Sequence, residues 1–155
     1  MRNDGMFRTP KSLAVIGLGT FGASLACRAR ATGARVVGID IVQKVADRFH
    51  GDLDSTICCD ARDKRALREC ALDDQDVVVI AVGSCVETSL LATHHAKALG
   101  AKRLFVKAQS DTQEDILRAI GVDGVFRPEC DAGRELADRI TETNTLSHID
   151  SLVAE

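Results

Sequence analysis

Three glycines near the start of the chain have the spacing of a phosphate-binding loop. Residues 17–22, with the sequence GLGTFG, match the pattern G-x-G-x-x-G, directly after an apolar run and directly before a segment of helical period. In this context Gly17 allows the tight turn out of a strand, Gly19 lets the backbone approach a phosphate, and Gly22 lets the helix pack close to the sheet. The start of the helix offers unpaired N–H groups and partial positive charge to an anion. The segment therefore predicts a nucleotide-binding loop.

An acidic residue lies where such a loop needs one for the sugar of the nucleotide. Asp40 ends the second apolar run, roughly 20 residues after Gly22, which is the separation expected of a carboxylate that accepts hydrogen bonds from both ribose hydroxyls. A carboxylate repels a 2′-phosphate, and the next residues, Ile41 and Val42, include no arginine that would bind one. The pattern therefore favours ATP, ADP or NAD(H) over NADP.

Small and polar residues also follow the later apolar runs. Asp60 and Ala61 follow the third run and are candidates to flank an adenine. Gly83 and Ser84 follow the fourth run, and Lys107 ends the fifth, where its ammonium group can neutralise a phosphate. Because the carboxyl ends of parallel strands meet at one edge of a sheet, we expect these residues to line one site. The residues expected to contact the nucleotide are Gly17, Gly19, Thr20, Phe21, Gly22, Asp40, Ile41, Asp60, Ala61, Gly83 and Lys107.

Short β-branched runs alternate with longer segments of helical period along the whole chain. The predicted strands are 13–16, 36–39, 56–58, 77–82, 104–106 and 124–126. The predicted helices are 20–32, 42–50, 62–71, 85–99, 111–120 and 129–143. Strict alternation of this kind is typical of βαβ units, and the right-handed crossover rule leaves few ways to wind them. We therefore predict an α/β, Rossmann-like fold: a doubly wound, parallel six-stranded sheet with strand order 3-2-1-4-5-6.

Composition and charge narrow the class of protein. The chain has 155 residues, of which 45% are hydrophobic, and a formal net charge of -3. These values suit one globular domain and give no reason to expect nucleic acid as a partner. No apolar run approaches the roughly 18 residues that span a bilayer, and the N-terminus lacks a signal-peptide core. The six cysteines include no C-x-x-C pair, so we expect a cytoplasmic protein with reduced thiols.

The chain is expected to divide into three segments. Residues 1–10 are predicted to be a flexible leader, residues 11–143 the nucleotide-binding domain, and residues 144–155 a C-terminal crossover or linker helix. Apolar residues recur at mostly three- and four-residue steps near the C-terminus, which predicts an apolar helical stripe. The stripe consists of Leu136, Ile140, Leu146, Ile149, Leu152 and Val153. We expect residues 136–143 to pack on the sheet and the rest of the stripe to contact a partner.

The sequence has no recognisable set of catalytic residues. It contains no tyrosine, it shows no His–acid pair, and the six βα units use its whole length, which leaves no substrate-binding domain. We therefore predict that the chain is not an enzyme but a sensor. Three other hypotheses remain open at this point: a small NAD-dependent oxidoreductase, a redox protein that uses Cys58 and Cys59, and an orphan nucleotide-binding module.

Six segments share their sequence pattern with one known family. They are residues 15–22, 37–40, 78–83, 105–109 (FVKAQ), 120–129 and 144–150. Dehydrogenases do not share the patterns of 105–109 and 120–129. Together the six segments resemble the KTN/RCK (TrkA-N) nucleotide-binding domain over residues 12–150. The chain is most similar to the cytosolic gating subunits of Ktr-type potassium uptake systems.

This resemblance implies a regulatory role. Subunits of this kind bind ATP, ADP or NAD(H) and control potassium flux through a membrane channel subunit. They form homodimers that build an octameric ring, attached peripherally to the inner face of the cell membrane through the channel subunit. The resemblance therefore implies a cytoplasmic, nucleotide-sensing gating subunit.

The resemblance also implies one ion site and reveals two departures. Glu129 matches a family position linked to a divalent or sodium ion near the phosphates. Thr20 stands where Ktr-type members often carry an arginine that reaches a neighbour's γ-phosphate, so selectivity for ATP over ADP is not implied. No segment of the chain matches the family's C-terminal ligand-binding lobe.

Overall fold

The computed structural model describes residues 11–153, and it describes side chains as far as residue 141. The strands are β1 (Ser12–Ile16), β2 (Arg35–Asp40), β3 (Ser55–Cys58), β4 (Val77–Ile80), β5 (Leu104–Lys107) and β6 (Gly124–Phe126). The α-helices are α1 (Thr20–Ala31), α2 (Gln43–Arg48), α3 (Lys64–Arg68), α4 (Val86–Ala98), α5 (Asp111–Ile120) and α6 (Pro128–Val153). A short 3-10 helix, η1 (Leu72–Asp74), precedes β4.

All neighbouring strands run parallel, in the order β3-β2-β1-β4-β5-β6. The predicted fold class and strand order are therefore confirmed. In the central pairings, Ile16 of β1 lies opposite Ile39 of β2 on one side and Ile80 of β4 on the other. The chain moves from β1 outward to β3 and then returns to β4, so the order reverses between β1 and β4, where such folds bind ligands.

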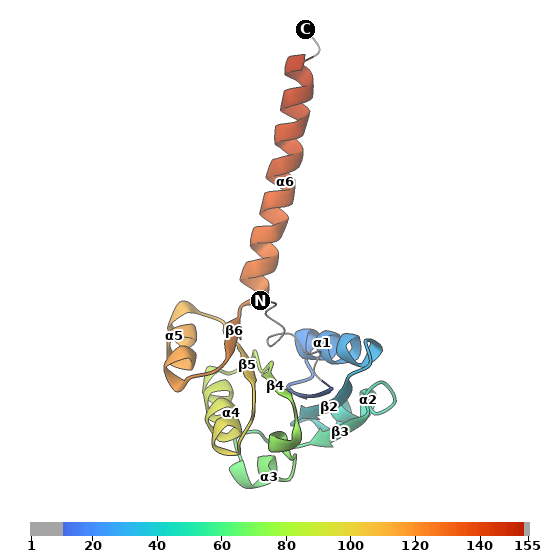
Figure 1. The fold of residues 1–155 in the computed structure, drawn as a ribbon, viewed down its shortest axis with the longest axis vertical. Coiled ribbons are helices and arrows are strands. Elements are labelled where there is room, and N and C mark those ends of the chain that lie inside the picture. Colours follow the sequence, from blue (N-terminus) through green and yellow to red (C-terminus); the bar gives the residue numbers. More distant parts are fainter. Residues whose placement is uncertain (1–10, 154–155) are drawn as a thin grey trace, which may run out of the picture.

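Two hydrophobic layers form because side chains alternate between the faces of each strand. On β1, Ala14 and Ile16 belong to the layer that packs on α4 and α5, together with Leu67 of α3. Leu13 and Val15 belong to the opposite layer, which packs on α1. All four residues of β4 are buried, as their apolar run predicts for a strand covered on both faces. Figure 1 shows the helices α1 and α4 on opposite sides of the sheet.

Several helix ends follow from single residues. The Ser110 side chain accepts a hydrogen bond from the Gln113 backbone N–H at the start of α5, and Gly121 closes that helix in the left-handed conformation. The Asp63 side chain accepts hydrogen bonds from two backbone N–H groups at the start of α3. Pro128 is the first residue of α6, a position where its missing N–H leaves no hydrogen bond unmade.

The structure corrects the predicted position of the C-terminal helix. Leu136 and Ile140 are 59% and 55% exposed, and all of residues 136–141 are exposed, so this part of the helix does not pack on the sheet. The side chains of the rest of the predicted stripe lie outside the described residues. Figure 1 shows α6 extending away from the sheet. The helix follows β6, the edge strand, and every residue of the helix from 131 to 141 is exposed. The helix is continuous through residue 143, so the boundary predicted there remains a proposal, and the predicted leader 1–10 lies outside the described residues.

Two smaller differences concern element lengths. β4 ends at Ile80 rather than at residue 82, which leaves Ala81, Val82 and Gly83 free to line the site described below. α2 and α3 are shorter than predicted. No helix among residues 11–153 has the length and apolar content required to cross a membrane.

We predict that Gly22→Ala destabilises the fold. A Cβ at Gly22 would lie 1.9 Å from the carbonyl oxygen of Gly17, so the strand end and α1 would have to separate. We expect the free energy of unfolding, measured in urea, to fall by about 3 kcal/mol, despite the better helix propensity of alanine.

Gly133→Ala is the matched control, because Gly133 is also helical and has nothing within 4 Å of its Cβ position. Its stability should be unchanged or slightly higher. Equal stability of both variants would contradict the close packing of α1 on the loop.

Candidate nucleotide-binding site

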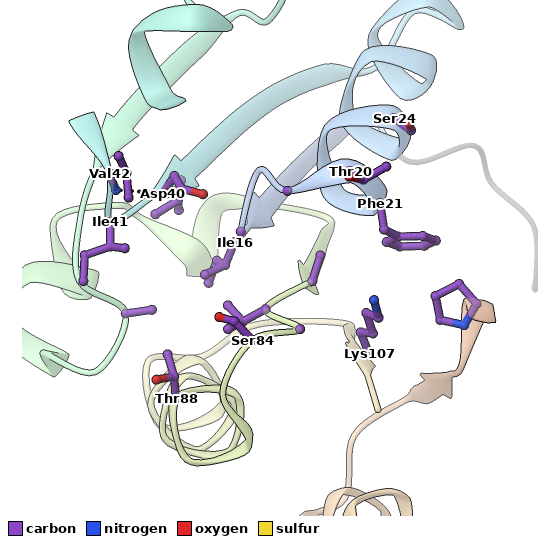
Figure 2. Close-up of a pocket in the computed structure, with 18 of the residues that line it drawn as sticks. Ile16, Thr20, Phe21, Ser24, Asp40, Ile41, Val42, Ser84, Thr88 and Lys107 are labelled. Atoms are coloured by element: carbon purple, nitrogen blue, oxygen red, sulfur yellow. Dashed lines mark hydrogen bonds between the residues drawn. The ribbon is translucent and has the colours of Figure 1, made fainter. Parts of the chain in front are cut away.

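A cleft of about 940 Å³ opens at the carboxyl edge of the sheet, where the strand order reverses. Its walls come from the ends of β1 to β5 and from the first turns of α1 and α6. Figure 2 shows Asp40, Ile41 and Val42 together at one end of the cleft and Lys107 with Phe21 at the other. A cleft of this size at this place is the usual ligand site of a doubly wound sheet.

The glycine loop lies between β1 and α1, and each of its glycines has a different role. Gly17 adopts a positive φ of 95°, and its N–H donates to the carbonyl of Ile39 at 2.8 Å. Gly22 packs against Gly17 beneath the loop and does not line the cleft, unlike the other predicted loop residues. Gly19 caps α1, and nothing lies within 4 Å of its Cβ position. Because Gly19 has no side chain to bond the first-turn N–H groups, they are available to an anion.

Asp40 connects the loop to the sugar end of the cleft. One carboxylate oxygen accepts the N–H of Leu18 at 2.8 Å, and the other accepts the N–H of Val42 at 2.9 Å. A carboxylate has about four acceptor sites, so these two bonds orient the group and leave acceptor capacity for two ribose hydroxyls. Asp40 therefore also holds the glycine loop in place, a structural role that its position in the sequence does not reveal.

Lys107 is the one lysine that lines the cleft. Its side chain is only 10% exposed, and its Nζ lies 2.5 Å from Oε1 of Glu129 and 5.9 Å from the centre of the Phe21 ring. Phe21 in turn stacks on Phe126 with a centroid distance of 5.0 Å. The hydrogen bond from Lys107 lowers the pKa of the Glu129 carboxyl group, which favours the carboxylate form of Glu129.

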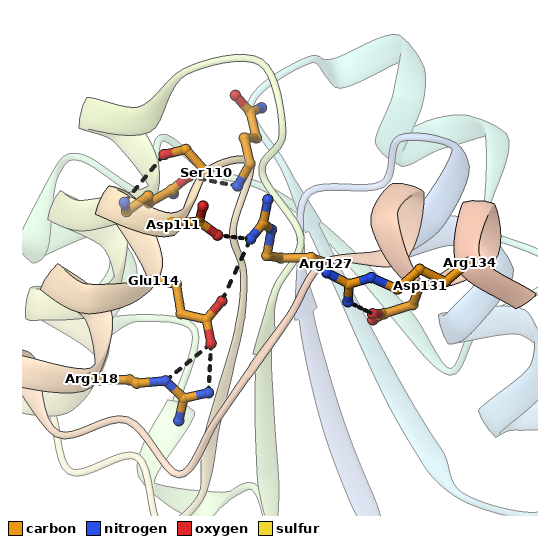
Figure 3. A network of polar contacts seen from close by, with 9 residues as sticks. Ser110, Asp111, Glu114, Arg118, Arg127, Asp131 and Arg134 are labelled. Atoms are coloured by element: carbon orange, nitrogen blue, oxygen red, sulfur yellow. Dashed lines mark hydrogen bonds and ion pairs between the residues drawn. The ribbon is translucent and has the colours of Figure 1, made fainter.

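The start of α6 is also held from its other side. Arg127, which directly precedes α6, pairs with Asp111 and lies 4.0 Å from Glu114 of α5. Figure 3 shows this network, in which Glu114 also pairs with Arg118 at 2.6 Å. The first turn of α6 is thus connected to β5 through Lys107 and to α5 through Arg127.

The far end of the cleft combines aliphatic and charged groups. Ile41 and Val42 follow β2, and Asp60, Ala61 and Arg62 follow β3. Arg62 forms an ion pair with Asp60, with Nη2 and Oδ2 2.8 Å apart, and its hydrogen bonds lower the pKa of the Asp60 carboxyl group. All of these residues except Val42 and Arg62 are among the site residues predicted from the sequence.

The structure brings the predicted site residues together, with one exception. Gly22 is the exception, because it supports the loop from below. The predicted residues that line the cleft are Gly17, Gly19, Thr20, Phe21, Asp40, Ile41, Asp60, Ala61, Gly83, Lys107 and Glu129. Three polar lining residues were missed: Ser24 of α1, Arg62 and Thr88 of α4. Only their nearness to predicted strand ends or helix starts could have identified them.

Glu129 does not form a complete ion site with its neighbours in this chain. Its side chain is 70% exposed and pairs with Lys107. Among residues 11–141, no group of three His, Cys, Asp or Glu side chains is placed to hold a metal. A cation at Glu129 would need further oxygen ligands, such as those of a nucleotide phosphate, and the site therefore remains a prediction.

The cysteines give little support to the redox alternative. All six are free thiols. Burial raises the pKa of the Cys59 thiol, and burial raises that of its neighbour Cys70 to about 12. A thiol that stays protonated at neutral pH is a poor nucleophile, so the pair Cys58–Cys59 lacks one reactive partner.

Comparison with known proteins assigns the chain to a family. Residues 13–128 match the model of the TrkA-N domain, and the chain belongs to this family. It is 32% identical over 140 residues to the Ktr system potassium uptake protein C of Bacillus subtilis, an alignment that covers 90% of this chain and 63% of that protein. It is 35% identical over 136 residues to the Ktr system potassium uptake protein A of Vibrio alginolyticus, which covers 88% of this chain and 62% of that protein. The chain thus spans less than two thirds of the length of these relatives.

Solved structures share the fold at low sequence identity. The NAD(P)-binding domain of an exopolyphosphatase-related protein from Archaeoglobus fulgidus aligns with a TM-score of 0.74 at 19% identity, covering 84% of this chain and 97% of that one. The structure of GsuK bound to ADP aligns with a TM-score of 0.70 at 19% identity, covering 83% of this chain and 33% of that one. These likenesses support the fold described above.

We predict that Asp40→Ala weakens ADP binding at least about tenfold, because the variant loses charge-assisted hydrogen bonds to ribose. Calorimetry measures the affinity. Asp47→Ala is the matched control, since it removes the same charge from the neighbouring helix α2, outside the cleft. Thermal unfolding of both variants shows whether Asp40→Ala also destabilises the loop that Asp40 holds. An unchanged unfolding temperature would assign the weaker binding to the lost ribose contacts. Equal ADP affinity in Asp40→Ala and the unmutated chain would place the ligand elsewhere.

Proposed function

We propose that the chain is the nucleotide-sensing part of a regulatory subunit that controls potassium flux through a membrane channel subunit. The observation that carries this proposal is the open space at Gly19, directly before the N-terminus of α1 and beside the Asp40 carboxylate. Phosphates fit in the open space at the N-terminus of α1, and a ribose fits beside the Asp40 carboxylate. The names of the Ktr relatives supply the potassium uptake system.

The ligand is ATP, ADP or NAD(H). The carboxylate of Asp40 opposes a 2′-phosphate, which disfavours NADP. Lys107 and the helix N-terminus provide positive charge for two or three phosphates at the other end of the cleft. The ADP-bound state of a protein with the same fold is consistent with this choice. A divalent or sodium ion at Glu129 would be held jointly with phosphate oxygens.

Binding is communicated through the start of α6. In the structure Lys107 is paired with Glu129, the second residue of that helix. An entering phosphate competes with Glu129 for the ammonium group of Lys107. The occupancy of the cleft then changes the contacts that hold α6, and α6 carries the change to the rest of an assembly.

The assembly is a homodimer that builds an octameric ring beneath the channel subunit, at the inner face of the cell membrane. Leu136 and Ile140 present more than half of their surface on the projecting helix α6, and exposed apolar surface of this kind favours a contact with a partner. In a twofold dimer the same stripe serves both copies.

This function requires no catalysis by the chain. The described residues that line the cleft include no histidine. Asp40 holds the loop, and Lys107 is paired with Glu129. The expected result is nucleotide binding without turnover, whereas an oxidoreductase would consume NADH with a carbonyl substrate.

The experiment that tests the proposal compares Gly19→Val with the unmutated chain. The valine side chain has space in the fold but fills the volume where phosphate meets the backbone, so the variant should remain folded and lose ADP binding by at least about 100-fold. Calorimetry with ADP, ATP, NAD and NADH gives the affinities, and circular dichroism verifies the fold. A folded Gly19→Val protein that binds these nucleotides with unchanged affinity would show that the glycine loop does not bind their phosphates.

A second variant tests the assembly. Ile140→Asp places a charge on the exposed stripe of α6 and should convert dimers to monomers without affecting ADP affinity, because Ile140 lies outside the cleft. Light scattering measures the mass, and Asp138→Asn on the same helix is the control. An unmutated chain that stays monomeric at high concentration would refute the dimer.

A further inference from the structure

The positions of the cleft residues along the sheet place the base of a bound nucleotide. Lys107 ends β5, the glycine loop follows β1, Asp40 ends β2, and Arg62 follows β3 at the edge of the sheet. A nucleotide with its phosphates at the loop and its ribose at Asp40 therefore extends toward β3. Its base reaches the end of the cleft that Ile41, Val42 and Arg62 line.

The guanidinium group of Arg62 is fixed in orientation before any ligand enters. Its Nε lies 3.0 Å from Oδ1 of Asp60, and its Nη2 lies 2.8 Å from Oδ2. The backbone N–H of Arg62 also donates to Oδ1 of Asp60 at 2.9 Å, and its carbonyl lies 3.1 Å from Nε2 of His95 on α4. These bonds use the edge of the guanidinium plane and the backbone. The flat faces of the group remain, and 52% of the side chain is exposed.

Two aliphatic side chains at the same end of the cleft are exposed to solvent. Ile41 is 54% exposed and Val42 is 49% exposed. A flat, partly apolar ligand that enters here removes this surface from water and meets a planar cation at the same time. Nucleobases stack on aliphatic side chains and on guanidinium planes in this manner.

We infer that Arg62 stacks on the base of the bound nucleotide and makes the cleft selective for purines over pyrimidines. The inference rests on the nucleotide binding proposed above. A purine has two fused rings and overlaps a guanidinium plane more fully than a pyrimidine does. Because Asp60 already balances the charge of Arg62, the arginine contributes through its plane rather than as a free charge for phosphates.

The test measures the affinities of ADP, GDP, UDP and CDP by calorimetry for the unmutated chain and three variants. Arg62→Ala should weaken ADP and GDP binding about fivefold to tenfold and UDP and CDP binding about twofold or less, since it removes the stacking plane. Arg62→Lys should not restore the loss, because an ammonium group has no plane. Arg65→Ala removes a nearby charge on α3, outside the cleft, and should match the unmutated chain.

Two results would overturn the inference while leaving the proposed function intact. Equal losses for purine and pyrimidine diphosphates, restored by Arg62→Lys, would show that Arg62 acts as a point charge. Unchanged affinities in Arg62→Ala would show that the base lies elsewhere. If the unmutated chain bound none of the four diphosphates, the proposed function itself would fail, and this inference with it.

Discussion

The close approach of Gly22 to the carbonyl of Gly17 determines where the site can be. A Cβ at position 22 would lie 1.9 Å from that oxygen, so only glycine lets α1 begin this near the end of β1. The N-terminus of α1 then points its free N–H groups into the cleft at the reversal of the strand order. The contact from Leu18 N–H to Asp40 fixes the same loop from the β2 side. One packing constraint therefore aligns the phosphate end and the sugar end of the cleft.

The opposite wall connects ligand binding to the rest of the chain. Lys107 is nearly buried, and Glu129 is mostly exposed. Water can solvate the carboxylate of Glu129 when it is unpaired, whereas the ammonium group of Lys107 needs a partner. A phosphate that approaches Lys107 can replace Glu129 without leaving a buried charge unpaired. Glu129 lies in the first turn of α6, and Arg127 ties the same turn to α5. The projecting helix is thus connected to the cleft by the Lys107–Glu129 ion pair, which a bound phosphate would replace.

The sequence was sufficient to predict the strand order and most of the cleft. The apolar runs of β1 and β4 fall on strands that are buried along their whole length. The glycine spacing alone is a weak signal, and its position between a strand and a helix, together with Asp40 at the end of β2, made it specific. The direction of α6 was not predictable in this way, since Leu136 and Ile140 have the same pattern whether a sheet or a second chain covers them. Arg62 was missed because a charged residue in a loop is ordinary, and only the bidentate bonds to Asp60 distinguish it.

The proposed ligand arrangement has the phosphates of a nucleotide at α1 and its base toward β3 in the glycine-loop cleft. The decisive measurement is a crystal structure of the chain grown with ADP. We expect phosphate oxygens within hydrogen-bonding distance of the N–H groups at the start of α1, and both ribose hydroxyls bonded to Asp40. ADP bound outside this cleft, or inside it with no ribose contact to Asp40, would refute this arrangement.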